Sequence, residues 1–208
     1  MAYTDDQLAV MEAIIARYPR KRSAIMPLLH YSQSITGYIN NEGIEIISEL
    51  LELENAEVTA VSTFYTQYKN QPVGEYHVGV CTNTLCAVMG GDAIFAGLKE
   101  HLGVENDGVT ADGKVSLEHI ECNAACDYAP VVMANWEFYD NQTVQSAKDL
   151  VDSMRTGNPK PPTRGPSKLV TWKEASAVLA GVNDGLANEG VQAGEPTLLG
   201  LKLSKEGK

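Results

Sequence analysis

The segments 81-CTNTLC-86 and 122-CNAAC-126 hold all four cysteines of a chain of 208 residues. Each segment follows directly on a stretch that reads as a β-strand. The run 76-YHVGV-80 alternates and is rich in β-forming residues, and residues 115–121 lead into Cys122 in the same way. Strand ends meet loops at the edge of a sheet, where binding sites commonly form. The pattern therefore predicts four thiols gathered at one edge of a sheet.

The spacing of the cysteines is informative about the group they hold. Cys81 and Cys86 form a C-x4-C pair, Cys122 and Cys126 form a C-x3-C pair, and 35 residues separate the pairs. Four thiolates of this kind suit a [2Fe–2S] cluster, with two cysteines on each iron. Small neighbours leave room for backbone N–H groups to reach the sulfurs. These neighbours are Ala87, Gly90, Gly91, Ala124, Ala125 and Ala129.

Three other uses of the cysteines stay open at this point. A structural zinc ion also takes four cysteines, although its pairs usually lie on hairpin turns and not at the start of a helix. Two disulfides would require an oxidising compartment. Dithiol exchange of the thioredoxin type uses C-x-x-C at a helix start, and neither pair has that spacing.

The cysteines lie in a predicted α/β domain over residues 71–157. A helix is expected over residues 87–102 and ends at Gly103, and a polar loop covers residues 105–114. Short strands follow near residues 131–134 and 138–139. A last helix is capped by Thr143 and stops at Gly157. The order β-α-β-β-β-α predicts one sheet with helices packed on it, with a thioredoxin-like arrangement as the nearest match.

Residues 1–70 are predicted to form a bundle of four short helices. Thr4-x-x-Gln7 has the form of a capping box, and apolar residues recur at helical spacing as far as Pro19. A second apolar stripe ends at Gly37. Asn40 and Asn55 are the expected caps of a third helix and of a fourth that extends to about residue 68.

Residues 158–208 are expected to be an extended extension rich in Pro and Gly. The run 158-NPKPPTRGP-166 cannot be helical, and one or two helical turns are possible near residues 172–179. Two interpretations are equally supported. The extension is a disordered tail, or it is an arm that orders on a partner. The residues that would anchor such an arm are Trp172, Leu198, Leu199 and Leu201.

The composition is that of an acidic globular protein. Hydrophobic residues make up 44%, charged residues 21%, and the formal net charge is −11. Such a charge, with no dense basic run, argues against binding to nucleic acid or to an anionic membrane. No apolar run approaches the roughly 20 residues of a membrane span. The start, 1-MAYTDDQLAV-10, does not have the pattern of a signal or transit peptide. We therefore expect a soluble cytoplasmic protein.

Other polar residues give weaker signals. No Ser/His/Asp or Cys/His set is recognisable, so no catalytic residue is predicted. His30 and His119 could reach a cluster, although packing in the core or at the surface is favoured. Glu121 precedes Cys122 and is equally compatible with tuning of the site or with ordinary exposure. The chain also lacks a Gly-rich nucleotide fingerprint.

Several stretches together resemble one family, the [2Fe–2S] subunit (E chain, 24 kDa-type) of NADH:quinone oxidoreductase, respiratory complex I. The similarity covers about residues 5–155. The matching stretches are 22-RSAIMPLLH-30, 36-TGYI-39, Glu57-Val58 with 62-STFYT-66, 80-VCTN-83 with Cys86, and Glu121-Cys122 with Ala125-Cys126 and Ala129-Pro130. The second cysteine loop departs from the family's common Cys-Leu-Gly-Ala-Cys, because Asn123 and Ala124 replace its Leu and Gly and Tyr128 is also less usual.

The resemblance implies a thioredoxin-like [2Fe–2S] ferredoxin fold and electron transfer as a subunit of an NADH dehydrogenase. Cys81 and Cys86 would hold one iron, and Cys122 and Cys126 the other. FMN and NADH would be bound by the partner F chain and not by this chain, and the large iron–sulfur G chain would be a second partner. The expected location is the peripheral arm at the inner face of the cell membrane. The alternatives are the equivalent subunit of an NAD-linked hydrogenase or formate dehydrogenase, or a zinc-stabilised interaction module without redox activity.

Overall fold

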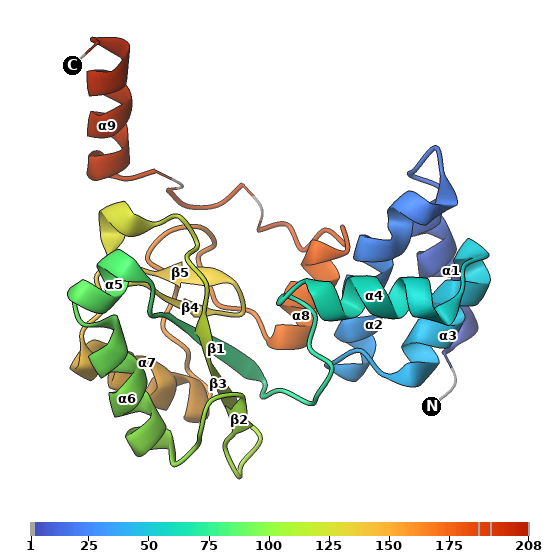
Figure 1. Ribbon diagram of the computed structural model, residues 1–208, viewed down its shortest axis with the longest axis horizontal. Helices are drawn as coiled ribbons and strands as arrows, with labels where there is room; N and C mark the ends of the chain where they lie inside the picture. Colours follow the sequence, from blue (N-terminus) through green and yellow to red (C-terminus); the bar gives the residue numbers. More distant parts are fainter. Residues whose placement is uncertain (1–2, 187, 192, 208) are drawn as a thin grey trace. The chain divides into compact units, whose positions relative to one another are not determined.

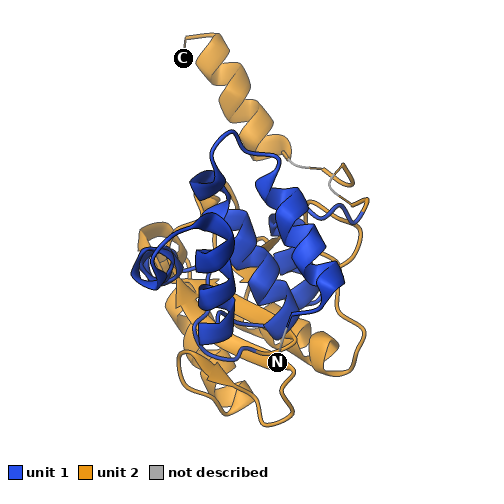
Figure 2. Ribbon diagram, turned by 90° about the vertical axis from the view of Figure 1, so that its right-hand side faces the viewer, with its two compact units in different colours: residues 1–73, 171–184 blue, residues 74–170, 185–208 orange. Residues whose placement is uncertain are grey.

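A computed structural model describes residues 3–186, 188–191 and 193–207 of the chain. The polypeptide forms two compact units, each assembled from separate stretches of sequence (Figure 2). The first contains the chain up to Val73 together with Thr171–Asp184, and the second contains Gly74–Val170 together with the chain from Gly185. The expected domain boundaries therefore need correction, because residues 158–208 are divided between the two units and do not form one separate extension.

The first unit is a helical bundle, and local capping explains most of its helix starts. The Thr4 side chain accepts from the backbone N–H of Gln7, which completes the expected capping box, and Asn40 accepts from Gly43 at 2.8 Å. The helices are α1 Asp5–Ile15, the 3₁₀ turn η1 Lys21–Ala24, α2 Ile25–Thr36, α3 Asn41–Leu51, α4 Asn55–Phe64 and α8 Trp172–Leu179.

The fourth helix differs from its prediction at both ends. Its N-cap is Glu54 and not Asn55, because the carboxylates of Glu54 and Glu57 form a reciprocal capping box. It ends at Phe64, whose ring is 77% exposed, although the apolar pattern continues to the buried Tyr68. Tyr68 lies in an irregular segment after the helix and is buried there. Its match to the apolar pattern therefore reflects tertiary packing and not a continuing helix.

The helix α8 belongs to the core of this unit. Trp172 is 1% exposed, and its indole Nε1 donates to the carbonyl of Gly37 at 2.7 Å. Gln33 Nε2 donates to Ser176 Oγ at 3.2 Å. A disordered tail is therefore excluded for residues 171–184, because they contribute a large buried side chain and buried hydrogen bonds.

The second unit is built on a mixed five-stranded sheet with the order β2-β3-β1-β4-β5 (Figure 1). Strands β1 and β3 are parallel, and the other neighbours are antiparallel. The strands are β1 Tyr76–Cys81, β2 Gly108–Val109, β3 Val115–Ile120, β4 Val132–Ala134 and β5 Glu137–Tyr139. This is the expected thioredoxin-like class, with β2 added where a polar loop was predicted.

Parallel neighbours need a crossover connection, which helices supply. One crossover helix was expected over residues 87–102, and the structure has two, α5 Thr84–Val88 and α6 Gly91–Leu102. The break falls at Gly90, whose φ of 112° is open to glycine alone. After β5, the predicted Thr143 cap starts α7 Val144–Arg155.

The two faces of the sheet carry different cores. Val78, Leu117 and Val132 point to the face that α6 and α7 cover (Figure 1), and all three are 0% exposed. The opposite face carries a smaller core that includes Cys81, Ile120 and Met133. Successive side chains of a strand point to opposite faces of the sheet, so Cys81 at the end of β1 points to this second face.

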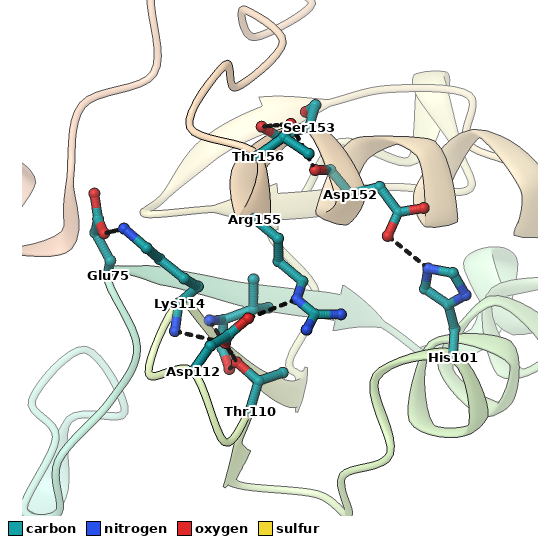
Figure 3. A network of polar contacts seen from close by, with 10 residues as sticks. Glu75, His101, Thr110, Asp112, Lys114, Asp152, Ser153, Arg155 and Thr156 are labelled. Carbon is teal, nitrogen blue, oxygen red and sulfur yellow. Dashed lines mark hydrogen bonds and ion pairs between the residues drawn. The ribbon is translucent and has the colours of Figure 1, made fainter.

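A polar network joins the turn between β2 and β3 to the end of α7 (Figure 3). Thr110 Oγ1 donates to Asp112 Oδ1 at 2.6 Å, and Arg155 Nε donates to Asp112 Oδ2 at 2.9 Å. The Thr110 hydroxyl, the Lys114 backbone N–H and the Arg155 guanidinium lower the pKa of Asp112 to about 2. This turn is therefore anchored by a carboxylate that stays ionised at neutral pH.

The second unit also contains α9 Glu195–Lys205, which the sequence analysis did not predict. None of its residues is buried, and Leu198, Leu199 and Leu201 are each more than half exposed. No helix in the described part of the chain is long and apolar enough to cross a bilayer.

Candidate metal centre

The four cysteines come from two loops that begin at neighbouring strand ends. Cys81 is the last residue of β1, and Cys86 lies in α5. Cys122 follows β3, and Cys126 opens the 3₁₀ turn η2 Cys126–Tyr128. Because β1 and β3 are parallel and pair Cys81 with Ile120, both loops leave the same edge of the sheet.

All four cysteines line one small cavity. Its lining is Cys81, Cys86, Cys122, Asn123, Ala125, Cys126 and Val131. The structure thus brings together every cysteine predicted from the sequence. His30, His119 and Glu121 do not line it: His30 packs against Tyr68 with ring centroids 4.7 Å apart, and His119 lies against Phe95.

The two cysteine pairs differ in their surroundings. Cys81 and Cys86 are each 3% exposed and sit in the small core of the sheet's second face. Cys122 and Cys126 are exposed, with their Sγ atoms 3.7 Å apart. That separation is far longer than a disulfide bond of about 2.05 Å. Because of this difference in burial, Cys81 and Cys86 line the inner side of the cavity, and Cys122 and Cys126 line its solvent side.

Polar groups approach the sulfurs from both loops. The backbone N–H of Ala124 donates to Cys122 Sγ at 3.3 Å. Asn83 Nδ2 lies 3.8 Å from Cys81 Sγ and donates to the Ile120 carbonyl at 2.9 Å, so this side chain links the two loops. Donors of this kind stabilise thiolate character and tune a bound metal group. Asn83 was not predicted as a site residue, although its place within 81-CTNTLC-86 was a usable signal.

The electrostatics of the site disfavour free thiolates at Cys86 and Cys126. Burial raises the pKa of Cys86 to about 11, with Cys81 and Cys126 adding to the effect, while the Val131 backbone N–H opposes it. The neighbouring Cys122 is the main cause of the raised pKa of Cys126. A bound cation would offset the mutual repulsion and the burial cost, since a coordinating thiol is deprotonated outright.

Gly91 sets how closely α6 approaches the first cysteine loop. A Cβ atom at this position would lie 2.5 Å from the Cys81 carbonyl oxygen and 2.9 Å from that of Cys86. Both contacts are to backbone and are too short to be relieved by a side-chain movement. The small residue predicted beside the cysteines is thus required here for close backbone packing.

The donor set fits a cluster with two sulfurs on each iron. All the potential ligands are soft cysteine sulfurs, which suit iron–sulfur clusters and zinc. Within the described residues, no three Cys, His, Asp or Glu side chains are placed to surround a single metal ion. A [2Fe–2S] cluster takes two cysteines on each iron, and the cavity is lined by two cysteine pairs.

Comparison with known proteins assigns the chain to a family. The sequence profile described as thioredoxin-like [2Fe-2S] ferredoxin matches residues 11–155. The chain belongs to the thioredoxin-like [2Fe–2S] ferredoxin family. The resemblance inferred from the sequence is thereby confirmed, and so is the fold class.

Within this thioredoxin-like [2Fe–2S] ferredoxin family, two relatives are similar over most of this chain. The E subunit of the NADH-quinone oxidoreductase of Mycobacterium tuberculosis (strain ATCC 25618 / H37Rv) is 55% identical over 210 residues, which cover 99% of this chain and 83% of that protein. The corresponding E subunit of Rickettsia bellii (strain RML369-C) is 39% identical over 157 residues, which cover 74% of this chain and 94% of that protein. The chain is thus a member of an oxidoreductase subunit family, as expected.

One solved structure shows the same ferredoxin fold at low identity. An NAD+-reducing [NiFe]-hydrogenase in the air-oxidized state aligns with a TM-score of 0.58 and 18% identity. The alignment covers 65% of this chain and 23% of the hydrogenase chain. Likeness at this level supports the fold alone.

Proposed function

We propose that the chain is an electron-transfer subunit of an NADH-quinone oxidoreductase and holds one [2Fe–2S] cluster. The observation that carries the proposal is the cavity lined by four cysteines from two loops that lie 35 residues apart in sequence. Family membership and the 55% identity to an E subunit of such an enzyme support the same conclusion. Cys81 and Cys86 would hold one iron, and Cys122 and Cys126 the other.

The chain's contribution is to hold and orient the cluster. When bound, a [2Fe–2S] cluster accepts and releases one electron at a time. Cys81 and Cys86 fix its inner side through a buried strand end and helix. Cys122 and Cys126 present its outer side toward solvent, where a redox partner can approach. Ala124 and Asn83 supply N–H groups beside two of the sulfurs.

The partner subunits follow from the same assignment. We place FMN and NADH on a partner F chain, with this cluster near that flavin, and the large iron–sulfur G chain as a second partner. The complex would form a peripheral arm at the inner face of the cell membrane. The sequence of this chain has no Gly-rich nucleotide fingerprint, so the hydride chemistry belongs to the partner.

Two alternatives have weaker support. An equivalent subunit of an NAD-linked hydrogenase or formate dehydrogenase rests on the resemblance of the sequence, since the likeness to a solved hydrogenase at 18% identity supports the fold alone. The similarity to the E subunits of NADH-quinone oxidoreductases is much higher and extends over 99% of this chain. A zinc-stabilised module without redox activity would use the same cysteines, and metal analysis separates it from the proposal.

The test is metal and sulfide analysis of the full chain prepared without oxygen, with EPR after reduction. About two irons, two sulfides and an S = 1/2 signal per chain are expected for a [2Fe–2S] cluster. Cys122→Ser should lose most of the iron, because one iron loses a thiolate, and Ser48→Ala on α3 serves as the matched control. Stoichiometric zinc without an EPR signal would overturn the proposal. Full iron content with an unchanged reduction potential in Cys122→Ser would remove that residue from the ligand set.

A further inference from the structure

The segment around Thr163 and Arg164 lies against the part of the chain that carries the second cysteine pair. These residues come after position 155, where the match to the family profile stops. The backbone N–H of Thr163 donates to the Phe138 carbonyl at 2.9 Å, and Thr163 Oγ1 accepts from the Asp140 backbone N–H at 3.0 Å. The segment is thus hydrogen-bonded to β5 and to the residue that follows it.

Arg164 occupies a defined position between two aromatic rings. Its guanidinium carbon lies 4.0 Å from the centroid of the Phe138 ring and 4.9 Å from that of the Tyr128 ring. Both rings pack against the small core that contains Cys81 and Cys86. Cation–π contacts of this kind gain strength where the cation is removed from water, and the Arg164 side chain is 17% exposed.

Asp140 fixes the direction of the same guanidinium. Its Oδ2 lies 3.1 Å from Arg164 Nε, and its Oδ1 accepts from Nη2 at 3.2 Å. Thr163 Oγ1 donates to Asp140 Oδ2 at 2.8 Å. The Asp140 side chain is only 7% exposed, so the ion pair is largely shielded from solvent. Arg164 is therefore held from one side by a carboxylate and from two others by rings.

A second contact reaches the same turn from farther along the chain. Thr197 Oγ1 donates to Asp127 Oδ2 at 2.6 Å, and Asp127 directly follows Cys126. A Cβ atom at Gly194 would lie 2.3 Å from the Tyr128 hydroxyl oxygen, so the backbone passes close to this ring. Two separate pieces of the chain beyond the family profile therefore contact η2, which begins at Cys126.

We propose that residues 160–166 and 194–197 act as a brace that positions the exposed cysteine loop, with Arg164 as its central positioning residue. The inference rests on the proposed function, because it assigns these residues a role toward the [2Fe–2S] cluster. The loop needs such support because Cys122 and Cys126 are exposed, whereas Cys81 and Cys86 are held in a core. The brace slows the release of iron on the exposed side and keeps the geometry at Cys126 constant.

The test compares full-length variants that have been loaded with the cluster. Arg164→Leu should accelerate iron loss to a ferrous chelator by roughly tenfold, since outer-shell changes typically cost 10–100-fold in metal affinity. It should also change the EPR g-values and the reduction potential. Arg164→Lys keeps a charge for Asp140 but loses the planar stacking, so its iron loss should be intermediate.

The matched control is Arg155→Leu, which breaks an arginine–carboxylate pair with Asp112 that does not involve the cysteine loops. It should leave iron loss, g-values and potential at wild-type levels. Thr197→Val tests the second contact and should accelerate iron loss a few-fold.

Wild-type rates of iron loss and wild-type EPR spectra in Arg164→Leu would overturn the proposal that these residues act as a brace. If that variant does not fold, wild-type rates in both Arg164→Lys and Thr197→Val overturn it. A wild-type chain that takes up no iron and sulfide would overturn the proposed function instead, and this is measured before any variant.

Discussion

At the residue scale, Ala124 shows how the second cysteine loop is shaped. Its φ of 55° lies in the left-handed region, and its N–H donates to Cys122 Sγ at 3.3 Å. This conformation costs an L-residue about 1–2 kcal/mol, whereas glycine adopts it freely. The alanine of this chain keeps the turn at the expense of backbone strain.

Ala124→Gly should therefore raise the free energy of unfolding, by less than about 1 kcal/mol, because glycine's greater freedom in the unfolded chain offsets part of the relief. The neighbouring Ala125→Gly is the matched control. Ala125 has a negative φ of −104° and is 6% exposed, so its variant should lose about 1 kcal/mol. Denaturant titrations of the cluster-loaded chain measure both values. A loss in Ala124→Gly as large as that in Ala125→Gly would contradict the strain argument.

At the element scale, α2 carries polar side chains into the core of the first unit. His30 is 5% exposed, its Nδ1 has no hydrogen-bond partner among the residues that the structure describes, and burial lowers its pKa to about 4. Gln33, on the same helix, is fully satisfied by its contacts to the Gln67 carbonyl, Ser176 and the Lys69 backbone N–H. The helix is thus stabilised by one buried polar group and made sensitive to acid by another.

The first unit should lose stability as the pH falls from 7 to 5. The unfolded chain protonates His30 near its ordinary pKa of 6.5, while the folded chain resists protonation down to about 4. The unfolded state therefore binds more protons in this window, and stability falls by about 2 kcal/mol at pH 5. The contribution is complete above pH 6.5 and is lost as the pH approaches 4.

Urea titrations at pH 7 and pH 5 measure this dependence. His30→Leu should remove most of it, whereas His101→Asn, at the surface of the second unit, should retain it. An equal pH dependence in wild type and in His30→Leu would show that His30 is not the group responsible.

At the scale of the whole molecule, the polypeptide crosses between its two units more than once. It leaves the first unit at Val73, returns to it for Thr171–Asp184, and then continues in the second. Some residues beyond 158 therefore complete the helical core of the first unit. Others belong to the second unit and contact the second cysteine loop within that same unit. The expectation that residues 158–208 form one Pro/Gly-rich extension is corrected, because these residues are divided between the two units.

Trp172→Ala should destabilise the first unit by about 3–5 kcal/mol, because a fully buried aromatic side chain leaves a cavity. The change also leaves the Gly37 carbonyl without its indole donor. Leu198→Ala is the control from the same C-terminal region, since Leu198 is 53% exposed and should change stability by less than about 0.5 kcal/mol. Hydrogen exchange of α2 amides reports the first unit directly. Similar values for the two variants would contradict the assignment of α8 to the core.

Local features of this protein could be predicted from sequence because their causes lie within a few residues. Thr4, Asn40 and Thr143 cap helices through hydrogen bonds that span three residues. The strands before Cys81 and Cys122 follow from their own alternation of side chains. The same reasoning placed the cysteines at strand ends and hence at one edge of the sheet.

Only the tertiary structure decided which contacts form between distant segments. The parallel register of Cys81 with Ile120 brings two loops together, and burial then distinguishes the inner cysteine pair from the outer one. Trp172 reaches Gly37 across 135 residues, and Arg164 reaches Asp140 across 24. No periodicity or motif encodes such pairs, because each depends on surfaces that exist only after the sheet and the bundle have formed.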